Sequence, residues 1–220
     1  MKFFLDSAII EEIQYGIDYL YIDGITTNPR HILTAKKPFL TCIKEIASLV
    51  KGTDLTVSVE VNPHITDFEE ILKEARALAK ISPNFVIKLQ CSESGLRAIP
   101  VLAKESIRVN LTLIFSPAQA LQAMRLGAFY ASPFLGWKEV NGENTQQFLD
   151  DIVTIRDNYC FKTFILAAAI RSGHTIVQAA VAGADIVTAG LGVYKEALQH
   201  PYTQEGIRRF SNFWDQTPYE

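Results

Sequence analysis

The chain has 220 residues, enough for one sizeable hydrophobic core, and α/β barrels commonly form a single domain of this length. Apolar residues make up 48% of it and charged residues 20%, as in an ordinary globular protein. The net charge of -3 gives no electrostatic reason to expect nucleic acid or an anionic membrane as a partner, and no apolar run is long enough to span a bilayer.

The cysteines, the histidines and the first residues suggest no disulfide framework, metal site or targeting segment. Cys42, Cys91 and Cys160 are odd in number and far apart, which is typical of free thiols in a reducing cytoplasm. The four histidines lack metal-ligand spacing, and neither a P-loop nor a full glycine-rich dinucleotide motif is present, so we expect no metal and no cofactor. The chain passes from Met1 almost directly into a strand-like run, so we expect no signal peptide.

Short apolar runs recur along the chain and alternate with helical patterns. The strand-like runs lie at 3–7, 25–29, 55–61, 85–90, 108–115, 126–132, 163–169 and 182–188. The helical patterns lie at 9–17, 39–50, 66–79, 96–104, 116–127, 146–156 and 204–214. Thr66 and Glu69 have the spacing of a capping box, and Ser116-Pro117 fits an N-cap followed by a first helical residue. Pro100 should kink or interrupt its helix.

Eight strands that alternate with helices are the pattern of a (β/α)8 barrel. The competing architecture is a doubly wound sheet, which would carry a glycine-rich phosphate-binding turn after its first strand. This chain has Leu5-Asp6-Ser7-Ala8 there instead. It also shows no linker, low-complexity tract or break in composition. We therefore predict an α/β fold, a single-domain (β/α)8 TIM barrel over residues 1–220.

The run Phe85-Val86-Ile87-Lys88-Leu89-Gln90 has the composition of a buried strand but contains a lysine. Charged side chains are rarely buried without a partner. One explanation is that Lys88 extends along its own aliphatic stem to reach solvent. The other is an amine desolvated at the mouth of the barrel, where burial favours the neutral form that attacks a carbonyl to make a Schiff base.

Polar residues gather at the carboxyl ends of the predicted strands, where (β/α)8 barrels carry their chemistry. Each has an ordinary explanation when taken alone, because such residues also cap helices, form strands or sit at the surface. Around one lysine, however, they predict a Schiff-base enzyme in which carboxylates move protons while amides and hydroxyls orient a sugar. The residues are Asp6, Thr26, Asn28, Glu60, Lys88, Asn110, Thr112, Ser132 and Arg171.

Five stretches resemble, in order and spacing, the successive signatures of the transaldolase family, and the resemblance covers essentially the whole chain. They are Leu5-Asp6-Ser7, Gly24-Ile25-Thr26-Thr27-Asn28-Pro29, Val86-Ile87-Lys88, Asn110-Leu111-Thr112-Leu113-Ile114-Phe115-Ser116 and Ser132-Pro133-Phe134. The length is similar to that of the short branch that also contains the fructose-6-phosphate aldolases. The resemblance implies a class I aldolase barrel, and a pentamer or decamer whose C-terminal helix packs on a neighbouring subunit.

The same resemblance assigns roles to the strand-end residues. Lys88 would form the Schiff base with a ketose, and Asp6 would handle the proton at the carbon–carbon cleavage. Asn28 and Asn110 would hold substrate hydroxyls, and Ser132 would contact the dihydroxyacetone end.

Glu60 and Thr112 help to separate the branches of the family. In transaldolases a glutamate and a threonine hold a water that shuttles protons, whereas the aldolases resemble a version with glutamine at the glutamate position. A carboxylate can accept a proton that an amide cannot. Glu60 therefore favours transaldolase activity, in which the dihydroxyacetone unit passes to an acceptor aldehyde.

Near the expected anion site the chain departs from the family pattern. Trp137, followed by Lys138, stands where a phosphate-binding arginine is usual, and Ala169 replaces a usual serine. Arg171 survives as an anion ligand, and Arg30 occupies a position that is commonly serine. A sulfonate monoanion needs less positive charge than a phosphomonoester, which is largely a dianion at neutral pH, and it tolerates an indole wall. Arg30, Arg171, Lys138 and Trp137 are the candidate contacts to the anion.

Asn28-Pro29-Arg30-His31 and Gly136-Trp137-Lys138-Glu139 resemble fragments of the transaldolases that act on 6-deoxy-6-sulfofructose in bacterial sulfoquinovose breakdown. This resemblance implies sulfofructose as donor, glyceraldehyde 3-phosphate as acceptor and sulfolactaldehyde as product. One alternative is that nearby residues rebuild a phosphate site, which would make the protein a fructose-6-phosphate transaldolase or aldolase. Another is a barrel without chemistry that serves as an assembly or binding protein, but the presence of Lys88, Asp6 and Glu60 argues against it.

Overall fold

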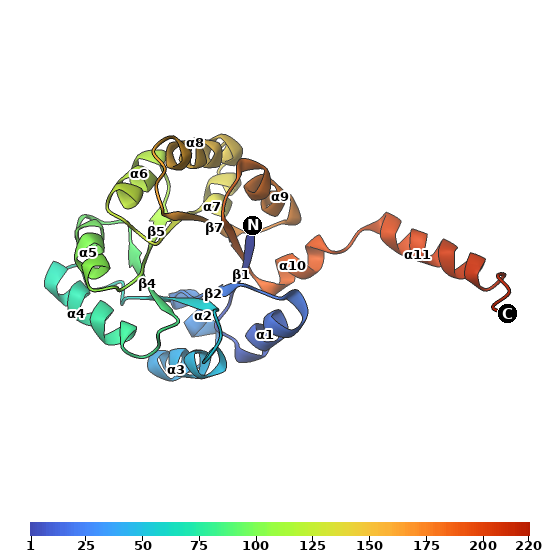
Figure 1. The fold of residues 1–220 in the computed structure, drawn as a ribbon, viewed down its shortest axis with the longest axis horizontal. Coiled ribbons are helices and arrows are strands. Elements are labelled where there is room, and N and C mark those ends of the chain that lie inside the picture. The colour runs from blue at the N-terminus through green and yellow to red at the C-terminus, as the bar shows by residue number, and fades with distance from the viewer.

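The computed structural model describes residues 1–220 and contains a closed barrel of eight parallel strands paired in sequence order. The strands are β1 (Lys2–Asp6), β2 (Gly24–Thr26), β3 (Thr56–Glu60), β4 (Phe85–Gln90), β5 (Val109–Ile114), β6 (Tyr130–Pro133), β7 (Phe164–Ile170) and β8 (Ile186–Ala189). Parallel neighbours need a crossover connection, and here helices provide it and surround the barrel (Figure 1). The predicted (β/α)8 fold is confirmed.

Twelve helical segments accompany the strands. They are α1 (Ile10–Tyr15), the π-helical η1 (Gly16–Leu20), α2 (Pro29–Thr34), α3 (Phe39–Leu49), α4 (Phe68–Ala79), α5 (Glu93–Lys104), α6 (Pro117–Arg125), α7 (Leu135–Val140), α8 (Thr145–Asn158), α9 (Gly173–Ala182), α10 (Leu191–Ala197) and α11 (Pro201–Trp214). The helical patterns of the sequence did not include α2, α7, α9 and α10. Helices α2, α7 and α10 have only six or seven residues, too few to display a helical period, and α9 has ten residues that are apolar on several sides.

Local capping explains where several helices begin and corrects the expected N-cap of one of them. The N-cap of α4 is Asp67 rather than Thr66, since the Asp67 carboxylate accepts the Glu70 backbone N–H at 3.0 Å. Helix α5 continues through Pro100 to Lys104, so this proline does not interrupt it. Helix α6 begins as predicted, with Ser116 as N-cap and Pro117 as first residue.

The barrel interior explains why polar residues meet at one end of the strands. A buried apolar cluster fills the interior: Phe4, Val86, Tyr130, Leu166, Ala168 and Ile186. The Phe4 ring occupies this space because Gly24 has no side chain; a Cβ there would lie 2.5 Å from the ring. Strand side chains alternate between two faces, so Asp6 and Lys88, two residues beyond Phe4 and Val86, point inward above the apolar cluster.

Helix α11 projects away from the barrel at the C-terminal end of the chain (Figure 1). Ile207, Phe210, Phe213 and Trp214 on this helix are exposed. Packing of α11 on a neighbouring subunit therefore stays a prediction. None of the helices has both the length and the apolar character needed to cross a membrane.

Candidate active site

A cavity of about 670 Å³ opens at the carboxyl ends of the strands. It brings together eleven of the twelve residues that the sequence proposed for catalysis or binding. These are Asp6, Thr26, Asn28, Arg30, Glu60, Lys88, Asn110, Thr112, Ser132, Trp137 and Arg171. Strand register explains much of this convergence, because Glu60 pairs with Lys88 and Lys88 with Asn110 across β3, β4 and β5. Asp6 pairs with Thr26 across β1 and β2 in the same way.

The Lys88 amine is held inside the cavity and does not extend to solvent, since the residue is only 5% exposed. Its Nζ donates a hydrogen bond to the Thr27 carbonyl at 3.0 Å and lies 3.5 Å from Glu60 Oε2. Burial raises the pKa of the Glu60 carboxyl above its ordinary value, although the nearby Lys88 charge acts in the opposite direction. A carboxyl of this kind, next to an amine, is suited to exchanging protons with it.

The Asp6 carboxylate is bound at both oxygens. Oδ1 accepts a hydrogen bond from Thr26 Oγ1 at 2.7 Å, and Oδ2 lies 3.1 Å from His31 Nε2. The Thr26 hydroxyl also lies 2.6 Å from Thr188 Oγ1. Burial acts to raise the pKa of Asp6, but the His31 hydrogen bond and the His31 and Lys88 charges outweigh it and hold the pKa below its usual value. Asp6 is therefore kept as a carboxylate, a hydrogen-bond acceptor and proton acceptor.

A second polar chain crosses β3, β5 and β6. Ser132 Oγ donates to Asn110 Oδ1 at 2.7 Å, and Asn110 Nδ2 donates to Ser58 Oγ at 3.0 Å. All three residues are buried, so these bonds fix the orientation of the Asn110 amide. Thr112 Oγ1, by contrast, is buried without a hydrogen-bond partner. Such a hydroxyl costs about 1–3 kcal/mol, which marks the position as one that a water or substrate hydroxyl would complete.

Asn28 has the helix-capping function that the sequence offered as its ordinary explanation. Its backbone is extended, and Oδ1 accepts the His31 backbone N–H at 3.0 Å at the start of α2. The amide Nδ2 makes no hydrogen bond within the protein. Asn28 therefore keeps two N–H donors for a substrate at the edge of the cavity.

The outer rim of the cavity is more exposed. Trp137 is 52% exposed, and its indole packs at 5.6 Å from the Phe115 ring and 5.9 Å from the Phe134 ring. Arg30 and Arg171 are exposed and form no ion pair. Helix α7 can approach Arg171 closely because Gly136 lacks a side chain; a Cβ there would lie 2.1 Å from the Ala169 carbonyl oxygen and 3.0 Å from Arg171 Nε.

The lining of this cavity does not include Lys138, whose role as an anion contact stays a prediction. Its amine pairs with Glu143, donates to the Phe115 carbonyl at 3.3 Å and lies 4.9 Å from the centre of the Phe148 ring. Trp137 and Lys138 are consecutive residues of α7, so their side chains leave the helix about 100° apart, and these contacts hold the Lys138 amine away from the cavity that Trp137 lines.

Three polar residues of the site were missed by sequence reasoning: His31, Ser58 and Thr188. Ser58 is the third residue of β3 and Thr188 is the third residue of β8, and serine or threonine at such positions also suits an ordinary strand. The only signal was strand alternation, which places Ser58 on the same face as Glu60 and Thr188 on the same face as Ile186. His31 belonged to no recognised metal or nucleophile spacing, and its contact depends on how α2 turns after Asn28.

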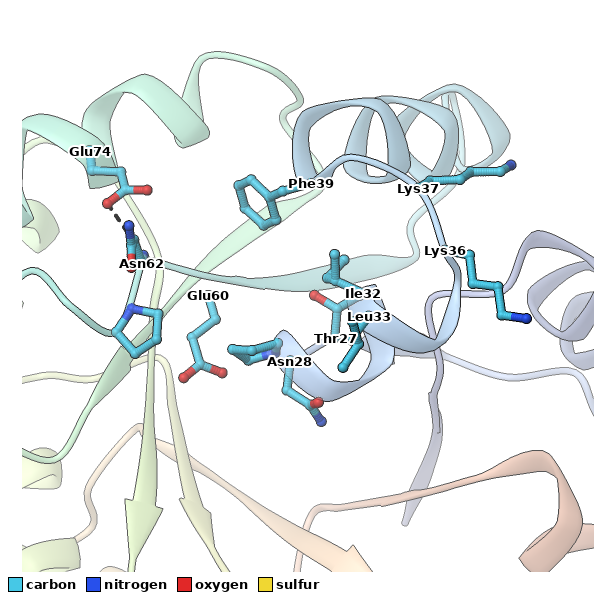
Figure 2. A pocket seen from close by; sticks show the side chains of 12 residues that line it. Thr27, Asn28, Ile32, Leu33, Lys36, Lys37, Phe39, Glu60, Asn62 and Glu74 are labelled. Carbon is cyan, nitrogen blue, oxygen red and sulfur yellow. Dashed lines mark hydrogen bonds between the residues drawn. The ribbon is translucent and has the colours of Figure 1, made fainter.

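A second cavity, of about 520 Å³, adjoins the first behind α2 (Figure 2). Figure 2 shows Glu60 and Asn28 on one side of it and Phe39, Ile32 and Leu33 along α2 and α3. Lys37, at the far edge, pairs with Glu45 at 2.5 Å.

Imine-based aldol chemistry requires a buried amine, a carboxyl beside it, a second carboxylate and several amides and hydroxyls. All of these groups lie at the mouth of this (β/α)8 barrel. Comparison with known proteins agrees with this class. The transaldolase/fructose-6-phosphate aldolase family profile matches residues 3–218. The chain belongs to this family, and it is an enzyme of the transaldolase type.

Several curated relatives match over nearly their whole length. A "6-deoxy-6-sulfo-D-fructose transaldolase" of Priestia megaterium is 52% identical over 221 residues, covering 100% of this chain and 98% of the relative. A "probable transaldolase" of Bartonella tribocorum is 45% identical, covering 99% and 98% of the two chains. Another "probable transaldolase", from Dictyoglomus turgidum, is 40% identical and covers 99% and 100%.

Proposed function

We propose that this protein is a Schiff-base transaldolase that transfers a dihydroxyacetone unit from 6-deoxy-6-sulfofructose to an aldehyde acceptor such as glyceraldehyde 3-phosphate, with release of sulfolactaldehyde. The observation that carries the chemistry is the buried Lys88 amine, 3.5 Å from the Glu60 carboxyl and in the same cavity as Asp6. The relative that is 52% identical and named for this donor supports the choice of substrate.

The chemistry follows from these groups. Lys88 Nζ attacks the ketose C2 carbonyl, and loss of one water gives an iminium ion. Asp6 takes the C4 hydroxyl proton as the C3–C4 bond breaks, and the bonding electrons move to the iminium nitrogen to give an enamine. The C4–C6 fragment leaves as an aldehyde. The enamine carbon then attacks the acceptor aldehyde, Asp6 returns the proton to the new hydroxyl, and water releases the product from Lys88.

Glu60 and Thr112 serve the proton transfers at the nitrogen. Forming the imine requires a proton for the departing water, and hydrolysis requires its return. The Glu60 carboxyl, whose pKa burial raises, can carry such a proton. Thr112 Oγ1, which is buried without a hydrogen-bond partner, would hold the water through which Glu60 passes this proton. Asn28, Asn110, Thr26 and Ser132 would hold the sugar hydroxyls.

The rim supports a sulfonate tail. Arg30 and Arg171 supply positive charge at an exposed position, and the Trp137 indole presents an apolar face and one N–H donor. A sulfonate carries one negative charge. It therefore loses less favourable electrostatic interaction than a phosphate dianion does where an indole replaces a guanidinium.

Competition between the two donors in one reaction tests the substrate. We expect kcat/KM for sulfofructose to exceed that for fructose 6-phosphate with the same acceptor. Trp137→Arg should shift the ratio about tenfold towards the phosphate, the value of one added charge-assisted hydrogen bond. A wild-type preference for fructose 6-phosphate would instead assign the fructose-6-phosphate transaldolase activity. Release of free dihydroxyacetone without an acceptor would assign the aldolase activity.

We also propose a cytoplasmic homo-oligomer. The three cysteines are free thiols, which suits a reducing compartment. The exposed apolar residues of α11, including Phe210 and Trp214, are a surface that a neighbouring subunit would cover. Sedimentation velocity of the whole chain should give a mass several times that of one chain, and Phe210→Asp should reduce it. A monomer at micromolar concentration would contradict this proposal.

A further inference from the structure

His31 makes a contact that the proposed reaction does not use. Its Nε2 lies 3.1 Å from Asp6 Oδ2, and its side chain is 21% exposed at the wall of the cavity. Because an ionised carboxylate only accepts hydrogen bonds, Nε2 must carry the hydrogen in this contact. The imidazole is thus a donor directed at the group that would take the C4 hydroxyl proton.

The position of His31 is fixed from the sequence upward. Pro29 starts α2 and Asn28 is its N-cap, with Oδ1 accepting the His31 backbone N–H at 3.0 Å. His31 is the third residue of the helix, and its side chain points back over the first turn, towards the end of β1. The cap therefore sets the direction in which the imidazole leaves the backbone.

The two oxygens of Asp6 are held from opposite sides. Thr26 Oγ1 donates to Oδ1 at 2.7 Å, and His31 occupies Oδ2. Each carboxylate oxygen has two lone pairs, so each keeps one for a substrate hydroxyl. Rotation about the Cβ–Cγ bond of Asp6 would break both contacts, which means that the pair defines the plane of the carboxylate.

The charged and titratable groups around Asp6 come from four elements. Besides His31 on α2, they are Lys88 on β4, Glu60 on β3 and Tyr194 on α10. Lys88 becomes part of the imine during the reaction and Glu60 has a raised pKa, so neither is a constant partner for Asp6. His31 is the neighbour whose contact with Asp6 does not change with the covalent state of the lysine.

We propose that His31 is a positioning residue for Asp6: its Nε2–H···Oδ2 hydrogen bond orients the carboxylate towards the C4 hydroxyl and keeps it ionised until the carbon–carbon bond breaks. This inference rests on the proposed Schiff-base function. It assigns to the imidazole no proton transfer of its own and no contact with the anionic tail.

Two substitutions distinguish a positioning role of His31 from a role in proton transfer or in anion binding. His31→Leu removes the donor, whereas His31→Gln keeps an N–H near the position of Nε2 but cannot become charged. We expect His31→Leu to lower kcat about tenfold or more, a part of the 10²–10⁴-fold contribution of a general base, with little change in the donor KM. Its acid limb of kcat/KM against pH should move to higher pH, because Asp6 loses a partner that favours its charged form and holds its pKa below the usual value. His31→Gln should recover most of both.

The controls make each outcome decisive. Borohydride trapping of donor on Lys88 reports the Schiff base separately, so an absent adduct in the wild type counts against the proposed function and not against His31 alone. His64→Gln, at an exposed position outside both cavities, should leave the profile unchanged. His31→Ala replaces the leucine variant if the latter does not fold. A raised KM with an unmoved acid limb would make His31 an anion ligand and overturn the proposal. A glutamine variant as slow as the leucine variant would also overturn it, by assigning the imidazole a proton-transfer role.

Discussion

The floor of the cavity and its rim are built differently. On the floor, Lys88, Asp6 and Asn110 are buried or nearly so, and each has hydrogen-bond or charged partners within the protein. On the rim, Arg30 and Arg171 are exposed and form no ion pair, and Trp137 is half exposed. Groups that are oriented before substrate arrives favour the reaction step, whereas exposed and unpaired groups gain their partner only from the ligand. We therefore expect the floor to determine the chemistry and the rim to determine which ketose is accepted.

The strongest test of the floor is Lys88→Met. Methionine keeps the length and apolar stem but removes the amine, so activity should fall to background and the borohydride adduct should disappear. Intact-mass measurement after incubation with donor ketose and borohydride reads this directly. Lys80→Met, at the exposed end of α4, is the matched control and should keep one adduct. An adduct that persists without Lys88 would place the reaction elsewhere.

Glu60→Gln tests the proton transfers on the same floor. The amide retains the shape but cannot carry the proton, so transfer to the acceptor should slow by about 10²-fold or more. Steady-state transfer rates at several pH values measure it. The control is Glu74→Gln, because burial raises the pKa of Glu74 as well but its carboxylate accepts a backbone N–H from Asn62 behind the cavity. Equal rates for wild type and Glu60→Gln would remove Glu60 from the mechanism.

Arg171→Ala tests whether the rim acts on the tail alone. Loss of a charge-assisted contact should raise KM for an anionic donor about 10–10²-fold and leave a neutral ketose such as fructose little affected. Lys138→Ala should change neither value, because the Lys138 amine is paired with Glu143 outside the cavity. A kcat defect shared by charged and neutral donors would show that floor and rim are not separable.

Thr112→Val should have the smallest effect. Thr112 differs from the other residues of the floor because its hydroxyl has no hydrogen-bond partner within the protein. The Thr112 hydroxyl is buried without a partner, so valine should raise stability by about 1 kcal/mol, or Tm by about 2–4 °C, while transfer slows several-fold. Thermal unfolding and transfer rates on the same preparation measure both. Lower stability with unchanged activity would mean that this hydroxyl is structural.

Much of the fold was predictable from the sequence because its signals are local. The alternating run 55–61 and the continuous apolar run at 85–90 mark strands, and Ser116-Pro117 marks the start of α6. Their succession is enough for a (β/α)8 barrel, since parallel strands need helical crossovers. The same reasoning located the carboxyl ends of the strands, and with them most of the candidate site.

Tertiary structure decided what depends on side-chain direction and on contacts between distant residues. Whether Lys88 reached solvent or stayed buried depended on the Thr27 carbonyl and on Glu60, which lie far from it in the sequence. Trp137 lines the cavity and Lys138 does not, and this difference depended on how α7 packs against the end of β7. That close packing is possible because Gly136 has no side chain. The contact of His31 with Asp6 depended on the turn that Asn28 and Pro29 impose. Sequence period fixes the face on which a residue lies, but only packing between elements determines which atoms that face meets.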